Sequence, residues 1–148
     1  MRAFAFLFIG LFAFGWLGCG SLSREPGLIK VLPHYLDKHG RHTTGVTLID
    51  RDLYQLELRK DPAAVHGVRY NINWRGNAEM TVRLEVRSTK AGVAPLILEQ
   101  TATPEGGSTW TPILIDVDTY KKFGQPESSR VTLWQDGDQV AEQASFLW

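Results

Sequence analysis

The stretch Gly67–Ser88, GVRYNINWRGNAEMTVRLEVRS, decides the fold of this 148-residue chain. Apolar side chains occupy every second position in both of its halves: Val68, Tyr70, Ile72 and Trp74, then Met80, Val82, Leu84 and Val86. The residues between them are almost all polar or charged. A period of two sends one set of side chains into a core and the other set to water. The stretch therefore predicts two β-strands joined by a hairpin turn at Arg75–Glu79.

More strands are expected on both sides of this stretch, namely Leu28–Leu36, Pro95–Thr103, Thr109–Val117, Arg130–Gln135 and Gln139–Leu147. Pro33 restricts the first of them to an edge or a bend, because proline has no N–H to donate to a neighbouring strand. Asp136-Gly137 is a strong turn signal and predicts that the last two strands form a hairpin.

Two segments indicate short helices. Asp50–Asp61 (DRDLYQLELRKD) fits a helix capped by Asp50, although alternation at Tyr54, Leu56 and Leu58 would also fit a strand. We favour the helix. Asp118–Phe123 predicts one helical turn, with Asp118 as its cap and Gly124 as its end.

The predicted elements favour one fold class. Short strands with turn signals roughly every ten residues, and little helix, are typical of a small antiparallel β-sandwich, immunoglobulin-like or transthyretin-like. The Cys…Trp…Cys pattern of true immunoglobulin domains is absent. We expect a single domain over residues 28–148.

Composition excludes several function classes. The chain has 16 basic and 16 acidic residues, so it lacks the basic excess that nucleic-acid binding requires. Its one cysteine allows neither an internal disulfide nor a thiolate metal site. We find no phosphate-binding loop, dinucleotide fingerprint or G-x-S-x-G motif. A non-enzymatic protein without a cofactor is therefore expected.

The first twenty residues, MRAFAFLFIGLFAFGWLGCG, have the features of an export signal. Arg2 provides the positive charge and Ala3–Leu17 the apolar run, which is shorter than the roughly 18–20 residues needed to span a bilayer. Trp16-Leu17-Gly18-Cys19 resembles the lipobox of bacterial lipoproteins, although Leu and a small residue are usual at its first two positions. A plain secretory signal cut after Gly20 and an uncleaved anchor are the alternatives.

The lipoprotein resemblance implies a processing route and a location. Residues 1–18 would be a cleaved signal peptide, Cys19 would carry diacylglycerol and a further acyl chain such as palmitate, and residues 19–27 would tether the domain. Gly20 after the cysteine resembles sorting to the outer membrane, facing the periplasm. The expected membrane contact is through the lipid on Cys19, since anchoring requires at least two lipid or charge signals.

Two groups of side chains suggest ion binding. His34, His39 and His42 lie close together with Asp37, and imidazole and carboxylate are ordinary zinc or copper ligands. The alternative is a solvated loop. Four carboxylates could similarly suggest calcium, although they fit turns and helix caps better: Asp116, Asp118, Asp136 and Asp138.

Trp110, Trp134 and Trp148 could line a binding surface, but for these residues a place in the sandwich core is the favoured interpretation. Phe146 and Trp148 are expected on one strand face. Together these features predict a lipid-anchored envelope protein with a non-catalytic binding domain, whose partner is another envelope protein or peptidoglycan. The alternative is a periplasmic carrier of a metal or small molecule that uses the His34–His42 loop.

Overall fold

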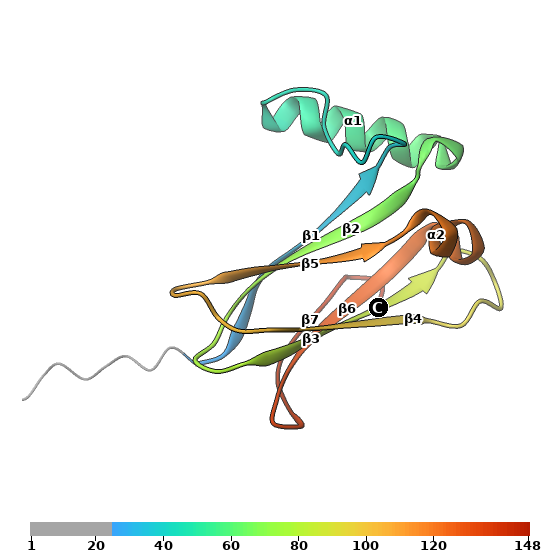
Figure 1. The fold of residues 1–148 in the computed structure, drawn as a ribbon. Helices are drawn as coiled ribbons and strands as arrows, with labels where there is room; N and C mark the ends of the chain where they lie inside the picture. The colour runs from blue at the N-terminus through green and yellow to red at the C-terminus, as the bar shows by residue number, and fades with distance from the viewer. Residues whose placement is uncertain (1–24) are drawn as a thin grey trace, which may run out of the picture.

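The computed structural model describes residues 25–148, which form two antiparallel β-sheets packed face to face (Figure 1). This confirms the predicted small β-sandwich. The expected signal peptide, the lipidation site Cys19 and most of the tether lie outside the described residues. Within residues 25–148, no helix is both long enough and apolar enough to cross a membrane.

Sheet A contains three strands in the order β1-β2-β5. Their bounds are Gly27–Leu36, Gly67–Arg75 and Thr109–Ile115. Sheet B contains four strands in the order β4-β3-β6-β7. Their bounds are Leu96–Ala102, Met80–Ser88, Pro126–Gln135 and Asp138–Ala144. Helix α1 (Leu48–Lys60) and the 3₁₀ turn η1 (Pro62–Ala64) connect β1 to β2, and α2 (Val117–Phe123) connects β5 to β6.

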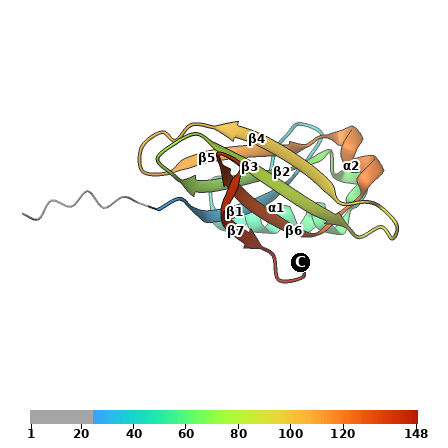
Figure 2. The same cartoon turned by 90° about the horizontal axis from the view of Figure 1, so that it is seen from below.

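The predicted hairpin at Arg75–Glu79 is wrong. β2 pairs with β1 and β5, whereas β3 pairs with β4 and β6, so the chain passes here from one sheet to the other (Figure 2). A Cβ at Gly76 would lie 2.8 Å from the terminal methyl of Met80 and 3.2 Å from the Trp74 ring, so a larger residue in this passage would have to displace the end of the Met80 side chain. Alternation shows which face of a strand is buried. Two strands paired in one sheet and two strands on facing sheets have the same alternating pattern, so the pattern could not distinguish a hairpin from a passage between sheets.

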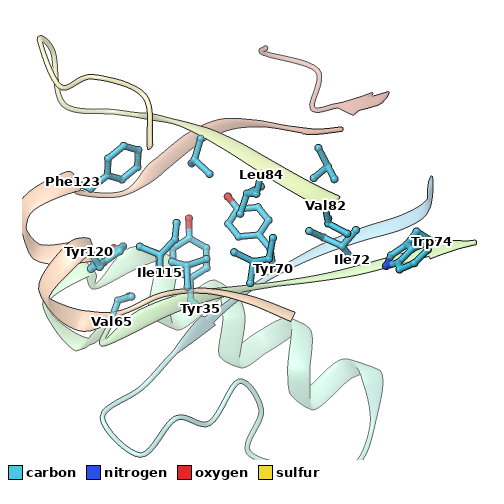
Figure 3. Close-up of a cluster of buried hydrophobic side chains, with 14 of the residues drawn as sticks. Tyr35, Val65, Tyr70, Ile72, Trp74, Val82, Leu84, Ile115, Tyr120 and Phe123 are labelled. Atoms are coloured by element: carbon cyan, nitrogen blue, oxygen red, sulfur yellow. The ribbon is translucent and has the colours of Figure 1, made fainter. Parts of the chain in front are cut away.

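The core lies between the sheets and is built from the two alternating sets that the sequence showed (Figure 3). Trp74 is fully buried, and its indole N–H donates to the Thr111 hydroxyl at 2.8 Å. Tyr35, Tyr120 and Phe123 close the end of the core near α2. Among residues 25–148, Trp74 is thus the tryptophan of the core, because Trp110 and Trp134 occupy outward strand positions and Trp148 follows the last strand.

Several boundaries differ from the prediction. α1 is capped by Thr47, not Asp50: the Thr47 hydroxyl accepts from the Asp50 N–H while the Asp50 carboxylate accepts from the Thr47 N–H, a capping box. α2 is capped by Asp116, not Asp118. The last strand ends at Ala144, so Phe146 and Trp148 share no strand face, and Phe146 is fully exposed. Positive φ angles at Asp136 and Gly137 match the predicted β6–β7 hairpin.

Candidate functional site

Helix α1 and the loop before it, residues 37–47, lie on the side of sheet A that faces away from sheet B (Figure 1). The helix is held to the edge of β1 by one side chain. The Gln55 amide accepts from the Tyr35 N–H at 2.7 Å and donates to the Tyr35 carbonyl at 2.9 Å, as a neighbouring strand would. It also donates to the His42 carbonyl at 2.9 Å. Gln55 therefore fixes the helix, the loop and the strand edge together.

The side of α1 that faces the protein is largely polar. Gln55 and Leu58 are its buried residues, and Tyr54 donates a hydrogen bond to Asp37 at 2.8 Å. Arg59 places its guanidinium 5.4 Å from the centre of the Tyr35 ring. Hydrogen bonds and one leucine, rather than an apolar stripe, thus attach this helix to the sandwich.

The opposite side of α1 is apolar and points to solvent. Ile49, Leu53 and Leu56 follow one another at helical spacing, and 70%, 58% and 48% of their surfaces are exposed. Leu48 and Val46 are exposed beside them. We call these five residues the α1 apolar face. A surface helix normally buries such a stripe, so this arrangement is the reverse of the usual one.

The same side of sheet A carries more exposed apolar surface on β5. The register places Leu114 beside Arg69 and Trp110 beside Asn73, on the outward face of the sheet. About half of each of these apolar side chains is exposed. Of the predicted tryptophan surface, therefore, Trp110 is clearly outward.

Trp134 and Trp148 lie on the outer face of sheet B, and neither is in the core. The Arg83 guanidinium lies 4.6 Å from the Trp134 ring centre. Two guanidinium groups lie over the Trp148 ring, and their central carbons are 4.1 Å (Arg87) and 4.9 Å (Arg130) from the ring centre. The three predicted tryptophans therefore do not form one surface, since they are divided between the outer faces of two sheets.

The histidines of the predicted metal loop are only partly brought together. The rings of His34 and His42 lie 4.8 Å apart between centroids, with His34 buried on the outward face of β1. His39 is exposed. Burial, followed by the positive charges of neighbouring side chains, lowers the pKa of His34 to about 4 and also lowers the pKa of His42. Both rings are therefore neutral at pH 7.

Asp37, the fourth predicted ligand, is used within the loop. Its carboxylate accepts from the Arg41 guanidinium at 2.9 Å, from the Tyr54 hydroxyl at 2.8 Å, and from the N–H groups of His39 and Arg41. Burial alone would raise the pKa of Asp37, but the hydrogen bonds from Arg41, Tyr54 and His39 together hold it well below its usual range. A cleft of about 350 Å³ lies next to this group, between the loop and α1.

Within residues 25–148, no group of three or more His, Cys, Asp or Glu side chains is arranged to hold a metal ion. The predicted set of His34, His39, His42 and Asp37 is not assembled into one site. The carboxylates considered for calcium also serve local structure: Asp116 caps α2, and Asp136 and Asp138 lie at the β6–β7 turn.

Sequence reasoning missed the α1 apolar face and the environment of His34. The spacing of Leu53 and Leu56 on one helical face was visible in the sequence, but nothing there showed which way that face points. Arg69 and Asn71 belong to a strand 35 or more positions beyond His34, so only the pairing of β1 with β2 places them beside it.

The comparisons with known proteins identify no relative. No family model, no curated protein and no solved structure matches this chain.

Proposed function

We propose that this chain is a lipid-anchored, non-catalytic binding protein of the bacterial envelope, held through Cys19 at the outer membrane on its periplasmic side. Its α1 apolar face would dock another envelope protein. The single observation that supports this function is the orientation of α1 about its axis. Its apolar side exposes Ile49, Leu53 and Leu56, while hydrogen bonds attach its polar side to the sandwich. Exposed apolar patches of this kind mark interaction sites.

The position of α1 in the molecule fits such a role. β1 begins at Gly27, the last residue of the proposed tether, and runs ten residues, about 30 Å, to Leu36. α1 leads through η1 into β2 at Gly67, which pairs with Leu36. The helix therefore connects to the sheet at the end remote from Gly27, where β1 begins (Figure 1).

A protein is a better partner than peptidoglycan for this face. Glycan strands are bound by aromatic rings combined with polar groups, whereas the α1 apolar face is aliphatic. The carrier alternative is not favoured in its metal form, since the four predicted ligands are not assembled.

The anchor and the docking face have separate tests. Metabolic labelling with a palmitate analogue should label the wild type and not Cys19→Ala, and equal labelling of the two would exclude the anchor. For the docking face, a photo-crosslinking residue at position 53 should give a discrete crosslinked band in intact envelopes. The matched control is position 97, an exposed isoleucine on β4. Identical crosslinking from both positions, or a band at 53 that survives Leu56→Lys, would contradict the docking function.

A further inference from the structure

Arg69 lies in an unusual position for an arginine. It is on the outward face of β2, directly beside His34 in the register, and it takes part in none of the ion pairs within residues 25–148. Its Nη2 donates to His42 Nδ1 at 3.4 Å, while its Nε–H is buried with no acceptor. A buried donor without a partner destabilises a fold, and a charged one does so more strongly. The described residues supply no acceptor for this N–H group.

The two histidines present further unused donors. The Asn71 amide nitrogen donates to His34 Nδ1 at 2.9 Å, so the ring hydrogen of neutral His34 is on Nε2. Because Arg69 donates to His42 Nδ1, the same holds for His42. Neither Nε2 has a hydrogen-bond partner in the described part of the chain. Strand β1, the loop and strand β2 thus each contribute one N–H group that has no acceptor among residues 25–148. Of the three, only the Arg69 Nε–H is buried, and the two Nε2 groups remain accessible to solvent.

The charge around this cluster is positive. No carboxylate is among the groups that shift the pKa of His34, and Asp37 in the loop and Asp52 on α1 are already occupied, by Arg41 with Tyr54 and by Arg51. Within residues 25–148, Arg69 has no carboxylate partner. An incoming anion would therefore find three donors and an arginine charge that no carboxylate neutralises.

We propose that His34, His42 and Arg69 form a binding site for a small tetrahedral oxyanion, such as a phosphate group. Three donors on three different elements suit the separate oxygens of such a group, and guanidinium is a preferred phosphate ligand. The site lies on the outward face of sheet A, next to the loop and α1. None of its three residues belongs to the α1 apolar face. It goes beyond the proposed function and does not depend on the lipid anchor. The phosphate could be free or belong to a lipid headgroup.

Binding should be coupled to protonation of the histidines. The charged and titratable side chains that act on His34 are Arg69 on β2, His42 in the loop, and Arg51 and Arg59 on α1. Burial, then His42 and these arginines, lowers its pKa to about 4. A bound anion would offset the positive charge and raise this pKa. By linkage, the anion then binds more tightly as the pH falls.

The test is a titration of the purified chain in detergent with inorganic sulfate at constant ionic strength, followed by the imidazole NMR signals of His34 and His42. Sulfate keeps its charge over the range used. We expect saturable shifts of both rings and an affinity about fivefold higher near pH 5.5 than near pH 7.5. Absence of saturable shifts at either pH overturns the proposal.

Two variants test the role of Arg69. Arg69→Met should weaken sulfate binding about tenfold and leave stability to urea unchanged or increased, because it removes a buried donor that has no partner. Arg83→Met is the matched control, since it removes one positive charge from sheet B and should change the affinity less than about twofold. Equal losses in the two variants would overturn the site. If Arg69→Met does not fold, His42→Ala in the loop must show the same loss.

The source of the phosphate is distinguished by two further arms. Inorganic phosphate alone, and vesicles of phosphatidylglycerol against phosphatidylcholine, are titrated in the same way. Shifts with free phosphate indicate a soluble ligand, and shifts only with phosphatidylglycerol indicate a headgroup. Failure of every arm excludes the site without affecting the crosslinking test of the α1 apolar face.

Discussion

At the scale of single residues, Gln55 has the most consequences for the fold. An edge strand exposes a row of unpaired N–H and C=O groups that can recruit another chain. In β1 this edge is protected by Pro33, as its position in the sequence predicted, and by the two hydrogen bonds between Gln55 and the Tyr35 backbone. One side chain here replaces part of a neighbouring strand.

Gln55→Leu should therefore be strongly destabilising. It leaves the Tyr35 N–H and C=O groups buried without partners, which costs about 2–4 kcal/mol of the free energy of unfolding. Urea denaturation measures this loss. Gln100→Leu on β4, where the glutamine is exposed, is the control and should stay within about 0.5 kcal/mol of the wild type. A small effect of Gln55→Leu would mean that the strand edge is satisfied by other groups.

His34 makes stability depend on pH. Its pKa is lowered by burial and by nearby positive charge from the ordinary value of 6.5 to about 4. Between these values the unfolded chain binds more protons than the folded one, so stability falls as the pH decreases from about 6.5 to about 4. The loss reaches at most about 3 kcal/mol, with a further contribution of the same sign from His42.

Urea midpoints measured across this pH range test the dependence. His34→Gln should reduce the slope of the curve between about pH 6.5 and 4.5 and leave the smaller slope that His42 contributes, since Asp37 begins to contribute only at lower pH. If the variant keeps the full slope, the titrating group lies elsewhere.

At the scale of elements, α1 is the helix for which the sequence could not show which face packs against the sheet. Its N-terminus is fixed by the Thr47–Asp50 capping box, a signal that is visible in the sequence. Which side faces the sheet depends on Gln55 and Tyr54, whose partners Tyr35 and Asp37 lie on β1 and in the loop. Polar contacts decide the orientation and leave the leucines outside.

Substitutions on the two sides of α1 should have opposite results. Leu53→Lys combined with Leu56→Lys should change the free energy of unfolding by less than about 1 kcal/mol, because both residues face solvent. Leu58→Ala removes a core side chain and should cost about 2–5 kcal/mol. Urea denaturation compares the variants. A large loss in the double lysine variant would show that the helix is turned the other way.

At the scale of the whole molecule, the strands differ in how firmly they are held. β3 is paired on both sides and its inward residues are fully buried, whereas β7 is an edge strand with mostly exposed side chains. Buried central strands open only on global unfolding, while edges open locally.

Amide hydrogen exchange should show this difference. The amides of Val82 and Leu84 should exchange only through global unfolding, and those within Asp138–Ala144 should exchange at least about tenfold faster. Uniform protection across sheet B would indicate that β7 is covered by a partner or a second copy.

Much of this molecule followed from local patterns. Alternation at Val68–Trp74 and Met80–Val86 marked the two central strands, Asp136-Gly137 marked the last hairpin, and the helix at Asp50–Asp61 was correctly preferred to a strand. These features depend on interactions within a few residues, which the sequence displays directly.

The sequence by itself determined which residues are buried in the central strands and where most turns and both helices lie, because periodicity and turn chemistry are local. Only the tertiary structure decided that β2 and β3 face each other across the core, that Trp74 is the tryptophan of the core, and that the leucines of α1 point outward. It also placed Arg69 beside His34 and His42. Strand pairing and helix orientation depend on contacts between distant segments, and a single sequence carries no record of which segments meet.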